Sequence, residues 1–404
     1  MQLMITRHAS RKGFSLGHSF ATKAKAFRIF PYNSASISKP FVAMRAGAGF
    51  LLLLLCGCHG PGAISPAGKQ SGNDLRLEFL DAPAAPVIDT NHPDLAGSKY
   101  GFEGGSVVKE GGVYHLFAAE MMGDPFWARM RIAHWTSPDA RSWRRAATLY
   151  ETSGAMDTND ARFSLWAPMP VFNEHENQWD LFYIAYRPLS SKPTEVMHLD
   201  GRVWRAASLV KGRGGIGGPY RDVGVVMQPD AESQSWEGQQ GTDSFYPWRV
   251  GRKWYGFYGS HNHIPQGPWL VGLAEAPALA GPWKRCAGLN PSTIERKFIE
   301  NPIVTRIGQK FVAIYDSSLD DANPNYVTDG HNVGLSVSAD GIHWPPGQRL
   351  DVQPGDASWS EDVRTPLCLI PEGNGVYTVL YTGKRKGQMF WPVELVRLKL
   401  VKVN

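Results

Sequence analysis

The feature that most constrains the fold of this chain is a unit that recurs five times between residues 100 and 400. Each copy has a polar or acidic opening residue, a short apolar strand, a Gly-containing turn, an aromatic strand, a variable loop and a further hairpin. The openings are Glu103, Trp166, Asp243, Glu300 and Glu361, 57 to 77 residues apart. Repeats of four short strands separated by turn residues are typical of β-propeller blades. The sequence therefore predicts an all-β fold, a single-domain propeller of five blades.

The last copy lacks one outer strand. Residues 75–80 alternate between apolar and polar side chains, as a half-buried strand does, and they have no place in the first copy. We therefore expect residues 75–80 to pair with residues 393–401 and to complete the fifth blade, which would tie the two ends of the domain together.

The positive charge of the chain is concentrated before the repeats. The formal net charge is +5, but residues 1–57 hold eight basic side chains and no acidic one, so the remainder has a net charge of −3. A mildly acidic body gives no electrostatic reason to expect a nucleic acid as partner. The basic bias is instead typical of a targeting segment.

That segment has the parts of a secretory signal. Met44-Arg45 precedes a short apolar run that ends in Leu55-Cys56-Gly57-Cys58. This ending resembles the lipobox of bacterial lipoproteins, which implies that Cys58 becomes the acylated first residue of an exported protein. We expect the protein to be anchored by lipid to the cell envelope, in the periplasm or at the outer membrane. Residues 1–43 are either an upstream start or part of a long leader.

The domain organisation follows from these segments. Residues 1–57 form the leader and signal, residues 58–74 form a flexible tether rich in Gly, Pro, Ser and Ala, and residues 75–404 form the propeller.

The propeller architecture brings the opening residues together, because the first strand of every blade lines the axis. Carboxylates that converge there repel one another, and one of them keeps its proton near neutral pH. A protonated acid facing an ionised carboxylate is what cleavage of a glycosidic bond requires. The candidate catalytic residues are Glu103, Asp243 and Glu300. The candidate substrate-binding residues, drawn from openings and from loops on the same face, are Trp166, Glu120, Trp127, Arg187, His261, His331 and Arg364.

The openings resemble those of the five-bladed glycoside hydrolases of families 43 and 32. Trp166-Ala167-Pro168, Asp243 and Ile299-Glu300-Asn301-Pro302 match the openings of the second, third and fourth blades in type and order. The resemblance implies that Glu300 is the general acid, that Asp243 orients it and tunes its pKa, and that Glu103 is the base. Glu103 is followed by two glycines where the family has Asp-Pro, and Asn301 replaces a small residue.

The resemblance implies hydrolysis of oligosaccharides or polysaccharides. A site like that of family 43 inverts the anomeric configuration and one like that of family 32 retains it; the Trp-Ala-Pro and Glu-x-Pro openings match family 43 better. Two alternatives stay open: a glycan-binding envelope lipoprotein without catalysis, and a glycoside phosphorylase, for which Arg187, His261 and Arg364 would have to bind phosphate.

No cofactor is expected to be required. His261-x-His263 and His331 are weak indications of a transition metal, because such sites need three or four converging ligands. A structural Ca²⁺ on the axis, near Asp316 or His331, is the one ion that the resemblance allows.

Overall fold

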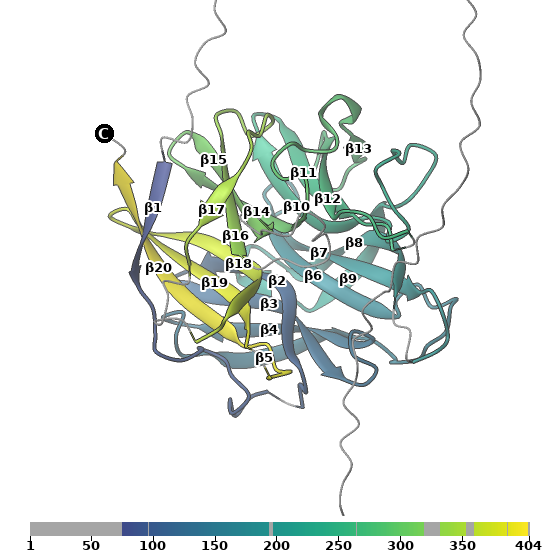
Figure 1. The fold of residues 1–404 in the computed structure, drawn as a ribbon, viewed down its shortest axis with the longest axis horizontal. Helices are drawn as coiled ribbons and strands as arrows, with labels where there is room; N and C mark the ends of the chain where they lie inside the picture. The colour runs from purple at the N-terminus through teal and green to yellow at the C-terminus, as the bar shows by residue number, and fades with distance from the viewer. Residues whose placement is uncertain are drawn as a thin grey trace, which may run out of the picture. The chain divides into compact units, whose positions relative to one another are not determined.

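Five antiparallel four-stranded sheets make up the part of the chain that the structure describes (Figure 1). The structure is a computed structural model, and it describes residues 75–402 except for 96, 194–196, 264, 319–331, 353–358 and 386. The chain divides into two units, Met1–Gly68 and Lys69–Asn404, and every described residue belongs to the second. Cys58 and the leader therefore lie outside the described residues. No helix among the described residues is long and apolar enough to cross a bilayer.

Each blade consists of four strands, given in order from the innermost to the outermost. Blade 1 comprises β2 (Gly101–Glu110), β3 (Val113–Gly123), β4 (Arg129–Ser137) and β5 (Arg144–Glu151). Blade 2 comprises β6 (Ser164–Asn173), β7 (Gln178–Pro188), β8 (His198–Lys211) and β9 (Tyr220–Met227). Blade 3 comprises β10 (Asp243–Val250), β11 (Lys253–Ser260), β12 (Leu270–Ala276) and β13 (Lys284–Arg285). Blade 4 comprises β14 (Ile299–Ile307), β15 (Lys310–Ser317), β16 (Asn332–Ser338) and β17 (Gln348–Leu350). Blade 5 comprises β18 (Asp362–Gly373), β19 (Val376–Lys384), β20 (Val393–Lys402) and β1 (Leu75–Asp81).

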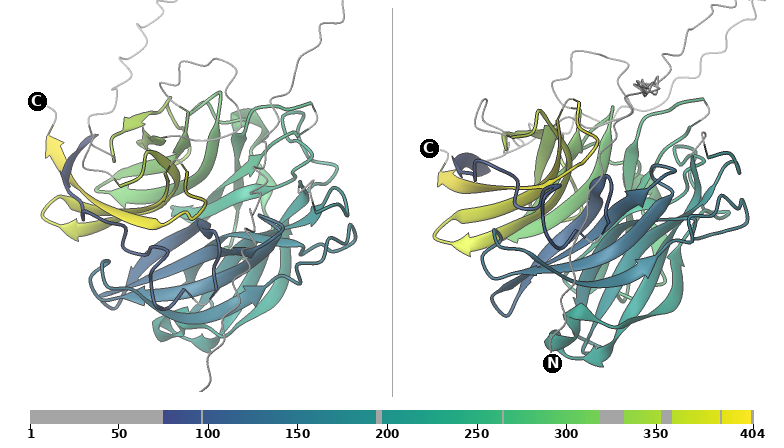
Figure 2. Two further views of the ribbon diagram at one scale, coloured as in Figure 1. Left: turned by 60° about the horizontal axis from the view of Figure 1, so that its bottom comes forward. Right: turned by 90° about the horizontal axis from the view of Figure 1, so that it is seen from below.

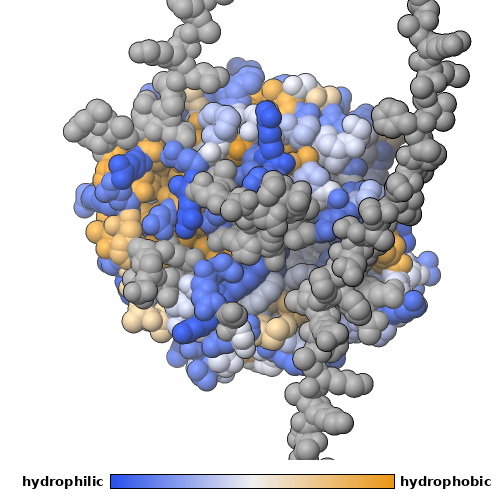
Figure 3. Space-filling view, viewed as in Figure 1, coloured by the Kyte–Doolittle hydropathy of each residue, from blue (hydrophilic) through white to orange (hydrophobic). Residues whose placement is uncertain are grey.

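The fifth blade is closed by the first strand of the domain, as the sequence predicts. β1 pairs with β20 from Leu75 opposite Lys402 to Asp81 opposite Arg397, and Arg397 Nε donates to Asp81 Oδ1 at 2.9 Å. Figures 1 and 2 show this purple strand beside the yellow C-terminal strand. Apolar side chains gather at this edge of the molecule (Figure 3), where β1 carries the exposed Phe79 and Leu80. The closure makes the described ends of the domain part of one sheet.

The core lies between the blades. Apolar side chains of neighbouring sheets pack face to face; Phe117 and Ile132 of blade 1, for example, pack with Leu165 and Trp179 of blade 2. Similar clusters join the other neighbouring pairs of blades. Inner strands also contact one another in the order β2, β6, β10, β14, β18 and back to β2. This packing holds the inner strands around a common axis and fixes the residues at which they begin.

Candidate active site

Every innermost strand begins with a β-bulge that interrupts its pairing to the second strand. The interruptions follow Phe102, Trp166, Asp243, Glu300 and Val363. In the first four blades a residue inside the bulge has positive φ: Gly104 (66°), Ala167 (46°), Ser244 (49°) and Asn301 (49°). Positive φ is sterically unfavourable for residues other than glycine, and bulges next to functional sites re-aim side chains. The backbone therefore repeats the same irregular turn in the first four blades.

The side chain just before each turn occupies an equivalent position in its blade. We call these five residues the axial ring: Glu103, Trp166, Asp243, Glu300 and Arg364. The fifth member follows from the motif, because Arg364-Thr-Pro aligns with Trp166-Ala-Pro and Glu300-Asn-Pro. Glu361, the opening expected from the repeat spacing, lies three residues earlier. The ring thus contains three carboxylates, one guanidinium and one indole.

Arg364 is the centre of a buried ion-pair network. Its Nη2 lies 2.6 Å from Glu103 Oε1, and its Nη1 lies 2.9 Å from Glu300 Oε2 and 3.0 Å from Asp316 Oδ2. Asp316, the residue before the last of β15, pairs with Glu300, and it also accepts a hydrogen bond from Asn301 Nδ2 at 3.1 Å. We call these four charged residues the axial cluster. One guanidinium therefore forms ion pairs with three carboxylates, and all four side chains are less than 10% exposed.

The fourth carboxylate, Asp243, lies beside this cluster. Burial, and then the charge of Glu300, raise the pKa of Asp243 to about 7, against the opposing effects of Tyr186, the Ser244 amide and Arg364. The Ser244 N–H donates to Asp243 Oδ1 at 2.6 Å. Burial likewise raises the pKa of Asp316 well above its usual value, although Arg364 lowers it. Asp243 and Asp316 can therefore be protonated at pH values at which an ordinary aspartate is ionised.

Asp243, Glu300 and Arg364 form part of the wall of a cavity of about 320 Å³. The remaining lining residues are Trp127, Trp166, Tyr186, His198, Gln240, His261, His263, Gln266 and Trp269. Pockets of this size with aromatic walls and a few convergent polar groups are the usual form of small-ligand sites.

The aromatic wall is tightly packed. The His261 ring stacks on Trp269 at 5.0 Å with the planes 4° apart, and Trp166 meets His198 edge to face at 5.2 Å. Burial lowers the pKa of both His198 and His261 to about 4, so both imidazoles are neutral at pH 7. Flat rings and neutral hydrogen-bonding groups suit a ligand with both apolar faces and hydroxyl groups.

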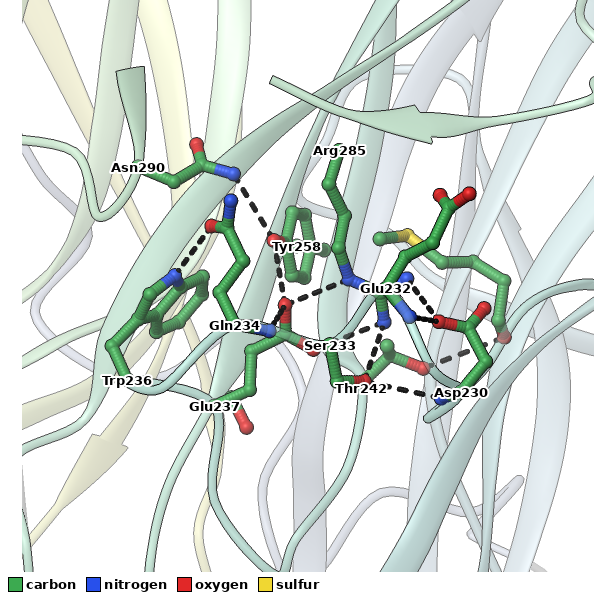
Figure 4. Close-up of polar contacts among 12 residues, drawn as sticks. Asp230, Glu232, Ser233, Gln234, Trp236, Glu237, Thr242, Tyr258, Arg285 and Asn290 are labelled. Atoms are coloured by element: carbon green, nitrogen blue, oxygen red, sulfur yellow. Dashed lines mark hydrogen bonds and ion pairs between the residues drawn. The ribbon is translucent and has the colours of Figure 1, made fainter. Parts of the chain in front are cut away.

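The segment between β9 and β10 brings Gln240 into the wall, and Arg285 of β13 holds that segment (Figure 4). Arg285 Nε donates to Glu237 Oε1 at 2.7 Å, and its Nη1 donates to Asp230 Oδ1 at 3.0 Å. Tyr258 donates to the same Glu237 oxygen at 3.0 Å. Beyond this clamp, Gln240 donates from its backbone N–H to the His261 carbonyl at 3.0 Å. The clamp therefore fixes one side of the cavity from the outer edge of blade 3.

The structure brings six of the predicted site residues together at the cavity: Asp243, Glu300, Trp166, Trp127, His261 and Arg364. Glu103 is 1% exposed and faces Arg364, and it does not belong to the cavity wall. His331 lies outside the described residues.

The structure places two predicted binding residues elsewhere. Glu120 is fully buried in blade 1, where it pairs with Arg131 and, at 3.1 Å, with Arg145; we call these three residues the blade-1 cluster. Arg187 is half-exposed and pairs with Asp200 at 2.6 Å. Neither belongs to the cavity wall.

Several lining residues do not stand out in the sequence. Tyr186, His198, Gln240, Gln266 and Trp269 lie near strand ends or on loops, where the repeat gives no register. The sequence places Asp316 among the loop residues of the fourth blade that converge on the axis and beside a structural ion; its pairing with Glu300 near the end of β15 places it in the axial cluster.

A small cavity beside the ring has no carboxylate in its lining, and the Ca²⁺ expected near Asp316 or His331 stays a prediction because His331 lies outside the described residues. A cavity of about 10 Å³, large enough for about one water, lies among the inner strands and is lined by Gly105, Ala167, Met169, Ser244, Phe245, Asn301, Pro302 and Ile303. Ca²⁺ takes six to eight oxygen ligands, usually including carboxylates, and none of these eight lining side chains is a carboxylate. Within the described ranges, no group of three or more His, Cys, Asp or Glu side chains has an arrangement that could hold a metal ion.

No protein-family profile and no curated protein sequence matches this chain. Solved structures do. A family 117 glycoside hydrolase from the marine bacterium Zobellia galactanivorans aligns with a TM-score of 0.53 and 13% identity, over 82% of this chain and 92% of that one. A family 32 β-fructofuranosidase from Bombyx mori aligns with a TM-score of 0.52 and 14% identity, over 82% of this chain and 64% of that one. A family 43 β-1,3-galactosidase aligns with a TM-score of 0.51 and 14% identity, over 79% of this chain and 60% of that one. The fold predicted from the repeats is confirmed: the chain is a five-bladed β-propeller of the kind found in these glycoside hydrolases.

Proposed function

We propose that this protein is a glycoside hydrolase that cleaves oligosaccharides or polysaccharides with a pair of carboxyl groups. The observation that carries the proposal is that Asp243 and Glu300 face one cavity walled by indole and neutral imidazole rings. Hydrolysis of a glycoside needs one carboxylic acid to protonate the leaving oxygen and one carboxylate to activate water or attack carbon. The raised pKa of Asp243, about 7, supplies a carboxyl group that can be protonated at neutral pH.

Inversion of the anomeric configuration is the outcome we propose, since the Trp166 and Glu300 openings resemble family 43 more than family 32. Proton NMR of the first-formed sugar distinguishes the two outcomes, because an inverting enzyme releases the opposite anomer before mutarotation. Appearance of the same anomer as in the substrate would contradict this part of the proposal.

A glycan-binding protein without catalysis is the second candidate. It is favoured by Glu103, the residue that the resemblance implies as the base, because this side chain contacts Arg364 and lies outside the cavity wall. A phosphorylase is less well supported. Arg364 is bound by three carboxylates, Arg187 lies outside the wall, and His261 is neutral, so these three candidates offer little positive charge to a phosphate.

One screen tests these alternatives. The purified propeller is incubated with aryl glycosides and with plant, algal and microbial oligosaccharides, with and without phosphate. We expect sugar release without phosphate, and loss of release with retained binding in Glu300→Gln. Binding without turnover by the wild type would instead support the glycan-binding protein, and release only with phosphate would support the phosphorylase.

Export and lipid anchoring at Cys58 complete the proposal. They are supported by the leucine run and the Leu-Cys-Gly-Cys ending. Incorporation of a labelled fatty acid in a bacterial host, lost in Cys58→Ala, would support them; equal labelling of both proteins would contradict them.

A further inference from the structure

A buried ion pair lies at the outer edge of blade 3. Arg285 belongs to β13, the outermost strand, and the side chains of Arg285 and Glu237 are 6% and 4% exposed. Nε of the guanidinium donates to Glu237 Oε1 at 2.7 Å, and Nη2 donates to Oε2 at 3.0 Å. Nη2 also donates to the Gln228 carbonyl at 3.0 Å and to Ser233 Oγ at 3.1 Å. One side chain therefore holds residues 228–237, between β9 and β10, at several places (Figure 4).

The chemistry of this pair indicates a role besides stabilisation. Taking two charges out of water costs free energy, and apolar side chains of similar volume often replace a buried ion pair without loss of stability. A guanidinium that binds a carboxylate with two nitrogens provides a fixed geometry in addition to its charge. The residues that this geometry holds in place therefore indicate what the pair does.

The held segment continues into the cavity wall. Gly238 directly follows Glu237, and its N–H donates to Ser260 Oγ at 2.9 Å. A Cβ at Gly238 would lie only 2.2 Å from the His261 carbonyl oxygen, so the segment passes close against blade 3. Two residues later, the Gln240 N–H donates to the same carbonyl at 3.0 Å. The backbone from the ion pair to Gln240 is therefore fixed, and the direction of the Gln240 side chain with it.

Gln240 connects this segment to a carboxyl group of the cavity. Its Nε2 donates to the Tyr186 hydroxyl oxygen at 3.1 Å, and the Tyr186 hydroxyl is in turn hydrogen-bonded to Asp243. Because the amide donates to the phenol oxygen, the phenol proton is directed to Asp243. Gln240 and Tyr186 are 4% and 1% exposed, and both line the cavity together with Asp243.

We propose that Arg285 and Glu237 are positioning residues of the cavity, which act on Asp243 through Gln240 and Tyr186. The inference rests on the proposed function and deepens it, because it extends the working parts of the site to the outer edge of blade 3. It holds whichever carboxyl group donates the proton, since every group that takes part in the reaction must be held in one orientation.

Replacement of the whole ion pair tests the proposal. The double variant Arg285→Met with Glu237→Leu leaves neither charge of the pair buried alone, so the propeller should fold. On the glycoside that the wild type cleaves, we expect kcat to fall about 10–10²-fold, because a small displacement of a group in the site has effects of this size. KM should change by less than about threefold. A kcat within about twofold of the wild-type value would overturn the proposal.

The ion pair of Arg205 with Asp180 in blade 2 provides the matched control. Its nitrogen and oxygen lie 2.9 Å apart, the side chains are 6% and 0% exposed, and neither residue belongs to the cavity wall. Like Arg285, which also binds Asp230, Arg205 has a second and more exposed partner, Glu176. Arg205→Met with Asp180→Leu should change kcat by less than about twofold. Equal losses in the two double variants would show general damage to the sheets and would overturn the positioning role.

A cycle of variants with Tyr186 tests the route. Tyr186→Phe removes the hydroxyl group, keeps the ring and should by itself lower kcat about 10–10²-fold. When the ion pair is replaced in Tyr186→Phe, kcat should fall by less than about threefold further, because the hydroxyl that the pair positions is already gone. Losses that multiply would mean that the pair and the hydroxyl act independently, which would overturn the route.

A conservative variant separates geometry from charge. Arg285→Lys keeps a positive charge beside Glu237, so it should fold, but it loses the contact through two nitrogens. We expect kcat to fall in this variant as well, by a smaller factor than in the double variant. Full activity of Arg285→Lys would contradict the role of the fixed geometry.

The positioning can also be measured without turnover. The ¹⁵N side-chain amide signal that disappears in Gln240→Leu should shift when the Arg285 pair is replaced and should stay in place when the Arg205 pair is replaced. An unchanged signal in the Arg285 double variant would overturn the proposal even in an active enzyme. A shifted signal in a protein that hydrolyses no glycoside would show instead that the proposed function has failed while the ion pair still positions Gln240.

Discussion

Two clusters of buried charge in this propeller have opposite balances. In the blade-1 cluster, two guanidinium groups and the Trp135 indole N–H, 2.8 Å away, surround the single carboxylate of Glu120. In the axial cluster, one guanidinium serves three carboxylates, with Asp243 beside them. A buried carboxylate surrounded by donors is stabilised by them, whereas crowded carboxylates compete for protons. The imbalance, rather than burial alone, distinguishes a site that can exchange protons from one that stabilises the sheet.

The largest expected difference between the clusters is in turnover. Glu300→Gln should lower kcat by about 10²–10⁴-fold, because in the proposed function it removes a carboxylate that takes part in proton transfer. Glu120→Gln should leave kcat of the folded protein within about threefold. Initial rates on the cleaved aryl glycoside, with folded protein quantified by circular dichroism, measure both. Similar losses in the two variants would remove the functional distinction between the clusters.

The loss of unfolding free energy should be larger in Glu120→Gln than in Glu300→Gln, the reverse of the order expected for turnover. Glu120→Gln leaves Arg131 and Arg145 buried without their shared counter-charge, which costs about 3–5 kcal/mol of unfolding free energy. Glu300→Gln leaves Arg364 paired with Glu103 and Asp316 and relieves some repulsion, so we expect a change below about 2 kcal/mol. Urea unfolding at pH 7 measures both values. A larger loss in Glu300→Gln would mean that the axial cluster is chiefly structural.

The unfolding free energy should depend on pH because the Asp243 carboxyl group at the axis has a raised pKa. The folded-state pKa of Asp243 is about 7 and its ordinary value is 3.8, so the folded state binds the proton more tightly. The contribution of this group to stability is therefore full below about pH 4, declines as the pH rises to about 7 and is constant above it.

The difference between variant and wild type isolates this effect. Asp243→Asn should gain about 2–3 kcal/mol relative to the wild type between pH 5 and pH 8. Glu394→Gln should gain in the same direction, because burial also raises the pKa of Glu394 to about 7, but it should keep its activity. Urea unfolding at the two pH values provides the measurement. A constant difference for Asp243→Asn would mean that its carboxyl group is already ionised at pH 5.

The two clusters also differ in how far the sequence predicts them. Axial residues recur at one place in each repeat, so the repeat pattern by itself places Trp166, Asp243 and Glu300 at the axis. The Arg364-Thr-Pro motif carries the same signal for the fifth blade. The blade-1 cluster depends on strand register, since Glu120 meets Arg131 only through the pairing of β3 with β4. From the sequence alone, Glu120 at a strand end is indistinguishable from a residue facing the ligand.

The fold is more predictable than the site for a related reason. Five repeats and the unpaired residues 75–80 determine the number of blades and their closure, because each is a local pattern. The cavity wall is formed by loops and strand ends. Tyr186 and Gln240, 54 positions apart in the chain, meet only because Gly201 of β8 pairs with the segment that leads into β10. Contacts of that kind require the packed structure.

The smallest expected effect concerns Arg187, which tests where the functional region ends. Its guanidinium pairs with Asp200 at 2.6 Å, and both side chains are more than one third exposed. An exposed ion pair contributes about 0–1 kcal/mol, since water and salt screen it. Arg187→Ala should therefore change unfolding free energy by less than about 1 kcal/mol and kcat/KM by less than about twofold, with Asp200→Ala as the matched control. A tenfold rise in KM in Arg187→Ala alone would extend the binding surface beyond the cavity wall, so that charge at the rim, as well as the axial cluster, would determine which glycans bind.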